Sequence, residues 1–254
     1  GKVGGWARRA AAAVLAAGPV PRHVALCMDG NRRYAQARHM RQVEGHTFGY
    51  RRLIDALEWC LELGVRYVSV YAFSIDNYRR CGEEVDTLMA LAEEKLAHML
   101  QEYDVLVRHG VQVRVVGDLS LAPAAVQVAA TRIMEATAQH DRAVLNLCFS
   151  YTASEELQRA LDDLAAHPAP SSSSGSGSLT AAGLDGQLYT RGCPPVDLLV
   201  RTSGETRLSD FLLWQCRHAL LVFTPVLWPD FGFLDLVAAV LEFQRHAPRL
   251  QRLR

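Results

Sequence analysis

The chain has 254 residues, half of them hydrophobic, which suits one large α/β domain or two small ones. Lysine plus arginine and aspartate plus glutamate each number 27, so the formal net charge is zero and gives no support to a nucleic-acid-binding protein. No apolar run reaches about 18 residues, so we expect no transmembrane segment in this sequence.

The first 20 residues form a distinct N-terminal helical segment. Residues 6–17 are rich in alanine and end at Gly18-Pro19, which predicts a short helix. Its basic start resembles a signal peptide, but the apolar stretch is short and weak. We therefore expect this helix to pack on the rest of the chain, on a partner or on a membrane surface. Residues 21–254 are interpreted as one domain.

Six short β-rich runs follow in that domain. Most are nearly continuous apolar stretches, which is typical of strands buried on both faces. The runs are residues 23–29, 67–73, 111–117, 143–150, 196–202 and 219–223.

Helical patterns alternate with these runs, at residues 46–63, 83–108, 122–139, 153–166 and 233–245. The alternation predicts an α/β fold: a single domain with a six-stranded, mainly parallel sheet flanked by helices on both faces. A serine- and glycine-rich segment at 168–178 interrupts it. We interpret this segment as a flexible loop within the domain, because the next strand is needed in the same sheet.

Polar side chains follow the strands, at the sheet edge where open α/β folds bind ligands. Asp29-Gly30-Asn31-Arg32-Arg33 comes after the first run, and SIDNYRR (74–80) comes after the second. Asp118 follows the third run, Ser150-Tyr151 ends the fourth, and RTSGETRLS (201–209) follows the fifth. One edge of the sheet is therefore expected to gather arginines, hydroxyls, amides and a carboxylate.

That mixture suits a phosphorylated substrate. Arginine side chains bind phosphate oxygens bidentately, and Gly30 and Gly204 allow sharp turns and a close backbone approach. Asp29 would repel a phosphate unless a cation lay between them, and Mg²⁺ is commonly held by one carboxylate together with phosphate oxygens and water. The pattern therefore predicts a Mg²⁺–diphosphate site in which Asp29 is the metal-linked acid.

Each of these features also has a purely structural interpretation. Asp-Gly-Asn is a good turn by itself, and Arg32 and Arg33 can be solvated surface charges. Ser209 can cap a helix that begins near residue 210. His46 is placed at the start of a helix, where a lone histidine is more often structural than catalytic. The convergence of these residues on strand ends favours the functional interpretation.

Other chemistries have less support in this sequence. It contains no G-x-S-x-G, H-E-x-x-H or G-x-x-x-x-G-K-[ST] motif and no paired-aspartate D-D-x-x-D motif. A nucleotide-binding module is disfavoured because a glycine-rich fingerprint is missing.

The motifs together resemble those of the cis-prenyltransferase family, in the undecaprenyl diphosphate synthase-like group and its eukaryotic dolichol-synthesis branch. The resemblance extends from about Pro21 to Gln244. It rests on MDGNRRYA (28–35), EGH (44–46), YAFSIDNYRR (71–80), GD (117–118), VDLLVRTSGETRLSDFLLWQ (196–215) and PVLWPDF (225–231).

The resemblance implies a prenyltransferase that adds isopentenyl diphosphate units in cis to farnesyl diphosphate, with Mg²⁺ as its cofactor. The product would be a long-chain polyprenyl diphosphate for dolichol synthesis and protein glycosylation. Catalytic roles are implied for Asp29, Asn31, Ser74 and Asn77, and Asp29 would also bind the metal. Substrate binding is implied for Gly30, Arg32, Arg33, His46, Tyr78, Arg80, Arg201, Arg207 and Ser209.

The resemblance also implies an apolar tunnel for the growing chain beneath the sheet edge. We expect its walls to include Ala72, Phe73, Leu88, Met89, Leu96 and Leu100. The amphipathic pattern alone is equally compatible with ordinary core positions for the helical members of this set.

Three positions depart from the family pattern. The arginine that usually precedes EGH aligns with Gln42, with Arg41 beside it, and which of the two matters stays open. Bacterial members carry a glutamate near position 220, which here is Leu220, as in eukaryotic-type catalytic subunits. The R-x-G motif that ends self-sufficient members is absent from residues 249–254.

Either the sequence is truncated before the R-x-G motif, or a partner supplies that motif, and we favour the partner and hence a heteromer. A Nogo-B-receptor-type accessory subunit would supply the motif and hold the chain peripherally at the cytoplasmic face of the endoplasmic reticulum membrane. A self-sufficient homodimer is the first alternative. A non-catalytic interaction subunit is a weaker one, because Asp29, Arg33, Arg201 and Arg207 are all present. The pattern determines neither the product length nor the stoichiometry.

Overall fold

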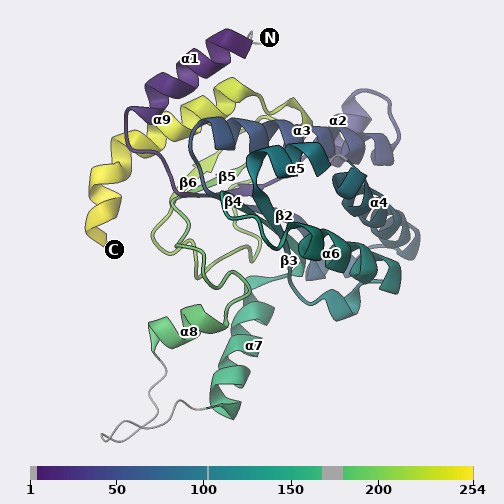
Figure 1. Cartoon of the computed structure of the whole chain (residues 1–254). Coiled ribbons are helices and arrows are strands. Elements are labelled where there is room, and N and C mark those ends of the chain that lie inside the picture. The colour runs from purple at the N-terminus through teal and green to yellow at the C-terminus, as the bar shows by residue number, and fades with distance from the viewer. Residues whose placement is uncertain (1–4, 102, 168–179, 254) are drawn as a thin grey trace, which may run out of the picture.

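The fold is built around a central six-stranded sheet (Figure 1). The computed structural model describes residues 5–101, 103–167 and 180–253. Neighbouring strands are parallel throughout, in the order β3-β4-β2-β1-β5-β6, so the predicted sheet is confirmed. The strands are β1 (His23–Cys27), β2 (Tyr67–Ser74), β3 (Val111–Val116), β4 (Ala143–Tyr151), β5 (Leu198–Arg201) and β6 (Leu220–Phe223).

The sheet is buried on both faces, as the continuous apolar runs predict. In β1, Val24 and Leu26 belong to the large core shared with the helices of one face. Ala25 and Cys27 belong to a second cluster, which includes Ala153 of α7 (Ala153–Ala166), Leu199 of β5 and residues of the irregular segment 208–216. The helices that contribute most of the buried helical residues of the first core are α3 (Gln42–Glu62), α4 (Gly82–Gln101), α6 (Ala124–Thr137) and α9 (Phe233–Leu250).

The strand order decides which loops meet. β1 lies between β2 and β5, and Cys27 is in register with Arg201. Because parallel strands end at the same edge, the segments after Cys27, Ser74 and Arg201 converge there. The chain also contains four short 3-10 helices. These are η1 (Ile75–Arg79), η2 (Leu119–Leu121), η3 (Trp228–Asp230) and η4 (Gln251–Leu253).

Several helix predictions were wrong in detail. The expected helix 83–108 is covered by α4 and α5 (Tyr103–His109), with residue 102 outside the described residues. Helices α2 (Asn31–Ala37) and α8 (Ala181–Gln187) are too short for a periodicity window to detect. Helix α3 begins at Gln42, before His46, because the Glu44 carboxylate accepts a hydrogen bond from the Arg41 backbone N–H at 2.9 Å. Residues 210–214 form turns, so Ser209 caps no helix. The expected loop 168–178 lies outside the described residues.

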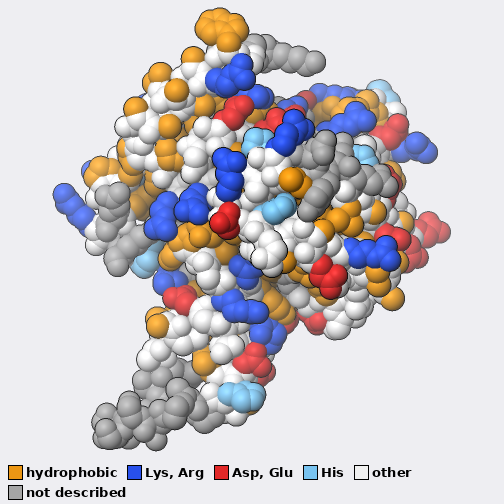
Figure 2. Space-filling model, viewed as in Figure 1, with side chains coloured by type: hydrophobic (Ala, Val, Ile, Leu, Met, Phe, Trp, Pro, Cys, Tyr) orange, Lys and Arg blue, Asp and Glu red, His pale blue; other side chains and the backbone are white. Residues whose placement is uncertain are grey.

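Helix α1 (Gly5–Ala16) packs on the domain against α9 and α3 (Figure 1). Ala12 and Leu15 are buried, and Gln244 Nε2 of α9 donates to the Leu15 carbonyl at 2.7 Å. Arg8 pairs with Glu62 at 2.8 Å. Within the described part of the chain, no helix combines the length and the apolar character that crossing a bilayer requires. Basic and acidic side chains are intermixed on the face shown in Figure 2, as the zero net charge suggests.

Candidate active site

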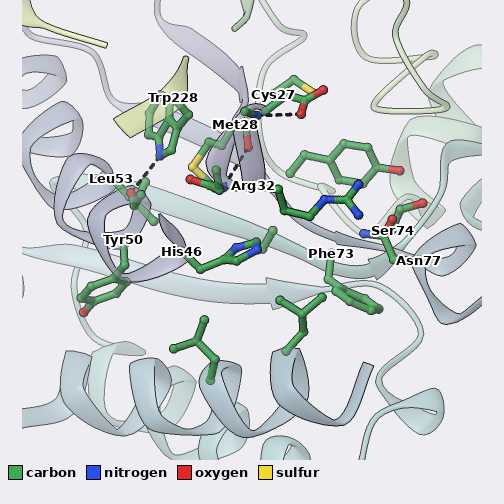
Figure 3. A pocket seen from close by; sticks show the side chains of 18 of the residues that line it. Cys27, Met28, Arg32, His46, Tyr50, Leu53, Phe73, Ser74, Asn77 and Trp228 are labelled. Carbon is green, nitrogen blue, oxygen red and sulfur yellow. Dashed lines mark hydrogen bonds between the residues drawn. The ribbon is translucent and has the colours of Figure 1, made fainter. Parts of the chain in front are cut away.

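A cavity of about 1170 Å³ opens at the carboxyl ends of β1, β2 and β5 (Figure 3). Its mouth is polar, and its interior passes between the sheet and the apolar faces of α3 and α4. Of the site residues predicted from the sequence, only Tyr78 is missing from the described lining. The predicted residues that line the cavity are Asp29, Gly30, Asn31, Arg32, Arg33, His46, Ser74, Asn77, Arg80, Arg201, Arg207 and Ser209.

Asp29 lies at the centre of the polar mouth. Its Oδ1 accepts a hydrogen bond from the Gly30 backbone N–H at 2.7 Å, and its Oδ2 accepts one from Arg201 Nη2 at 3.1 Å. Arg33 Nη2 lies 3.8 Å from Oδ1. The Asp29 side chain is still 35% exposed, so the carboxylate keeps free lone pairs toward the cavity.

The backbone around Asp29 is held from the neighbouring strand. Thr202 Oγ1 accepts from the Asp29 N–H at 3.0 Å and donates to the Asp29 carbonyl at 2.7 Å. Gly30 has φ 108°, and a Cβ there would lie 2.9 Å from Leu227 Cδ2, so both the turn and the packing require glycine. Arg33 then donates to the carbonyl of Ser203 at 2.9 Å and to its Oγ at 2.5 Å.

Arg201 connects Asp29 with the loop after β5. Its side chain is only 4% exposed, and its Nη1 donates to Ser209 Oγ at 2.8 Å and to the Arg207 carbonyl. Arg207 is 65% exposed in its side chain and pairs with Glu205. Arg201 is thus a fixed cation, whereas Arg207 is free to reach a ligand in the mouth.

Arg80, which directly follows η1, and Arg32 of α2 are both held by Glu84 of α4. Arg80 donates to Asn77 Oδ1 at 2.8 Å and to Glu84 Oε1 at 2.9 Å. Arg32 reaches the same Glu84 oxygen at 3.3 Å, so one carboxylate holds two arginines from distant segments. Ser74 caps η1 by accepting from the Asp76 N–H at 3.1 Å.

Tyr78 supports this loop from outside the cavity. Its hydroxyl forms a 2.6 Å hydrogen bond with Ser150 Oγ, and its ring packs edge-on against Phe73 at 4.9 Å. Asp118 caps η2, and neither Asp118 nor Ser150 is among the described residues that line the cavity. The polar residues Asp118 and Ser150 therefore brace the site from outside the cavity.

His46 enters the cavity from α3 and lies between Tyr50 and Phe73 in the view of Figure 3. Burial, together with the smaller effect of the nearby Arg80 and Arg32 charges, lowers the pKa of His46 to about 4. The ring is therefore neutral at pH 7, where it can donate one hydrogen bond but adds no positive charge.

Close packing positions Asn31. A Cβ at Gly49 would lie 2.2 Å from Asn31 Oδ1, and one at Gly45 would lie 2.4 Å from the Asn31 carbonyl. Asn31 Oδ1 is buried and has no hydrogen-bond partner within the described residues. Trp228 Nε1 donates to the Gly49 carbonyl at 2.8 Å, which fixes α3 next to the site.

The apolar interior agrees with the predicted tunnel in four of six positions. Ala72, Phe73, Leu88 and Leu96 line the cavity. Met89 is instead buried in the core, and Leu100 lines a separate groove between α4 and α6, because both lie on other faces of α4. Further apolar walls come from Tyr50, Leu53, Leu91, Ala92, Met99, Val115, Leu147, Phe149 and Trp228.

The side chains of Arg41 and Gln42 lie in different places. Gln42 lines the cavity, whereas the Arg41 side chain is 85% exposed and pairs with Glu44 at 3.4 Å. Arg41 therefore does not take, in the cavity, the place of the arginine that usually precedes EGH in the family.

The donor set suits a metal that is shared with a ligand. No group of three or more histidine, cysteine, aspartate or glutamate side chains within the described ranges could hold a metal ion. Asp29 offers a partly exposed carboxylate at the centre of the mouth, next to the fixed cation Arg201, which attracts phosphate. That arrangement fits Mg²⁺ held by one carboxylate and diphosphate oxygens, and it does not fit an all-protein cage.

Some functional neighbours were missed by sequence reasoning. Thr202, Ser203, Glu84 and Glu205 orient the arginines and Asp29, and Trp228 forms part of the wall. Thr202, Ser203 and Glu205 lie inside the quoted 196–215 motif, so their position after β5 could have marked them.

Comparisons with known proteins agree with this geometry. The family model described as putative undecaprenyl diphosphate synthase matches residues 27–251. A dehydrodolichyl diphosphate synthase complex subunit from Homo sapiens is 44% identical over all of this chain and 76% of its own length. An isoprenyl transferase from Thermus thermophilus is 39% identical over 92% of this chain and 90% of its own.

Two solved structures have folds similar to that of this chain. Lavandulyl diphosphate synthase from Lavandula x intermedia, in complex with dimethylallyl diphosphate, superposes with a TM-score of 0.80 at 30% identity over 89% of this chain and 95% of its own. A probable undecaprenyl diphosphate synthase from Campylobacter jejuni gives 0.74 at 28% identity over 89% and 96%. The chain therefore belongs to the undecaprenyl diphosphate synthase family, the cis-prenyltransferases.

Proposed function

We propose that this prenyltransferase is the catalytic subunit that extends farnesyl diphosphate with isopentenyl diphosphate, in cis, toward a long polyprenyl diphosphate for dolichol synthesis. One observation carries the proposal. Asp29 lies between two groups of arginines at the mouth of a deep apolar cavity, a first group of Arg32 and Arg33 and a second group of Arg201 and Arg207. A diphosphate head and a hydrocarbon tail need this combination of a charged mouth and an apolar interior.

The allylic substrate would place its diphosphate on the first arginine group. Gly30, Arg32 and Arg33 would bind the oxygens, with neutral His46 as a further donor. The allylic carbon would then lie near Asn31, and the tail would extend along Phe73 and Leu96. Mg²⁺ bound at Asp29 would supply charge stabilisation for the leaving diphosphate.

The isopentenyl diphosphate would bind the second group. Arg201 is prearranged by Ser209 and Asp29, and Arg207 is free to close on the diphosphate. Once the allylic C–O bond breaks, the isopentenyl double bond forms the new C–C bond and the adduct loses a proton. Asn77 and Ser74 face the cavity between the two groups and would orient the isopentenyl unit for this step. Fixed dipoles and charges of the site would supply most of the stabilisation of the transition state.

We also propose a heteromer. The human relative's name describes it as a subunit of a complex, which supports a partner for this chain. The partner that the family resemblance implies is an accessory subunit of the Nogo-B-receptor type. That partner would hold the chain at the cytoplasmic face of the endoplasmic reticulum membrane. The arginines and Asp29 argue against a non-catalytic role for this chain.

The test is incorporation of labelled isopentenyl diphosphate into extractable lipid, with farnesyl diphosphate and Mg²⁺. It is run on this chain alone, on the chain with the accessory subunit, and on each again with Asp29→Ala. Activity only with the partner, lost with Asp29→Ala, supports the proposal. Full activity of the chain alone would refute the requirement for a partner, and activity that survives Asp29→Ala would refute the role of this site.

A further inference from the structure

The turn that carries Ser209 has an unusual backbone. Ser209, Asp210 and Leu212 have φ values of 51°, 58° and 49°, in the left-handed region that non-glycine residues rarely adopt. Such a conformation persists only where the surroundings impose it. The contacts of this turn therefore indicate what holds Ser209 against Arg201.

Asp210 joins this turn to the start of α7. Both carboxylate oxygens of Asp210 accept from the Ser154 backbone N–H, each at 3.2 Å. The Asp210 carbonyl accepts from the Ala153 N–H at 2.8 Å. These two N–H groups belong to the first turn of a helix, where no intrahelical acceptor exists, and a negative charge is favourable there.

Two further contacts fix the same segment. The Tyr71 hydroxyl donates to the Ser209 carbonyl at 3.1 Å, and its ring stacks on Phe211 at 4.5 Å. On α7, the fully buried Glu156 accepts from Gln215 Nε2 at 2.9 Å. Helix α7 thus holds the segment after Ser209 at two points, through Asp210 and through Gln215.

We propose that Asp210 is a positioning residue for isopentenyl diphosphate, acting through Ser209. Asp210 is not among the described residues that line the cavity, so its effect passes through the backbone of the turn. If the turn relaxes, Ser209 leaves Arg201, and a guanidinium with a 4% exposed side chain loses a fixed partner. The inference rests on the assignment of Arg201 and Ser209 to the isopentenyl diphosphate subsite made above.

Three substitutions of Asp210 distinguish the effect of its carboxylate from the effect of backbone strain. Asp210→Gly removes the acceptor and relieves the left-handed strain, Asp210→Ala removes the acceptor and keeps the strain, and Asp210→Asn keeps one acceptor oxygen. Loss of a charge-assisted hydrogen bond should raise the KM for isopentenyl diphosphate about fivefold or more in the Gly and Ala variants. We expect Asp210→Asn to stay near the wild type and the KM for farnesyl diphosphate to change less than twofold in all three.

The assay uses the full chain with its accessory subunit, and Asp162→Ala, which replaces an exposed acid of α7, is the matched control. Ser209→Ala is the second control. If Ser209→Ala raises the KM for isopentenyl diphosphate while Asp210→Gly does not, the positioning role is refuted. If Ser209→Ala leaves that KM unchanged, the subsite assignment fails, and the inference fails with it. A parallel rise in both KM values with Asp210→Gly would indicate a general distortion of the active site and would also overturn the inference.

Discussion

Replacing Asp29 with asparagine tests the site most directly, because the side chain keeps its size and loses its charge. In the wild type, Asp29 Oδ2 lies 3.1 Å from Arg201 Nη2, and the two side chains are 35% and 4% exposed. Removing one partner of a fully buried ion pair costs about 3–5 kcal/mol of folding stability, but partial exposure of the acid reduces this to about 1–3 kcal/mol.

The effect on turnover should be larger than the effect on stability. The charge that would face the leaving diphosphate and its cation disappears, so we expect turnover to fall by about a thousandfold, or about 4 kcal/mol of transition-state stabilisation. The variant therefore separates a catalytic role from a structural one.

The assay combines isopentenyl diphosphate incorporation with urea unfolding of the same preparation. Asp55→Asn is the matched control, because Asp55 forms an ordinary surface pair with Arg52 at 2.9 Å. Turnover of Asp29→Asn within tenfold of the wild type would refute the reasoning, and so would a loss of activity that merely follows a loss of folded protein.

Three other predictions follow from the site. Because the folded pKa of His46 is about 4 and its ordinary value is 6.5, the unfolded chain binds a proton in that window that the folded chain does not. Stability should therefore fall as the pH decreases from 6.5 toward 4. Urea unfolding of His46→Gln should show a loss smaller by about 2 kcal/mol at pH 5. Leu96→Trp should shorten the products by filling the tunnel, seen by chromatography of the extracted lipids. Leu241→Trp on the exposed face of α9 should leave them unchanged. Arg207→Ala should raise the KM for isopentenyl diphosphate about tenfold and leave that for farnesyl diphosphate nearly unchanged, in steady-state assays; equal effects on both would contradict the two-subsite arrangement.

The local features of the site were accessible from the sequence. Asp29-Gly30-Asn31 directly follows a buried apolar run, and Arg201 ends another, so both could be placed at the same sheet edge. Asn77 and Arg80 were found in the same way. Met89 and Leu100 were misplaced because a helical pattern shows which residues are apolar, but not which neighbour each of them faces.

Interactions between distant segments were not accessible. Glu84 pairs with Arg32, Thr202 binds both backbone groups of Asp29, and Asp210 accepts from the first turn of α7. Each of these contacts depends on the strand order or on a non-helical turn, and no local pattern encodes either feature.

The amino-acid sequence by itself determined the α/β class, the parallel strands and the kind of chemistry at their carboxyl ends, because burial and turn formation depend on neighbouring residues in the chain. Only the tertiary structure decided that β1 lies between β2 and β5. This order brings Asp29 within 3.1 Å of Arg201, across 172 residues of sequence. The pairing of charges is a property of the assembled sheet, because electrostatic and hydrogen-bonding contacts act over a few ångströms of space whatever their separation along the chain.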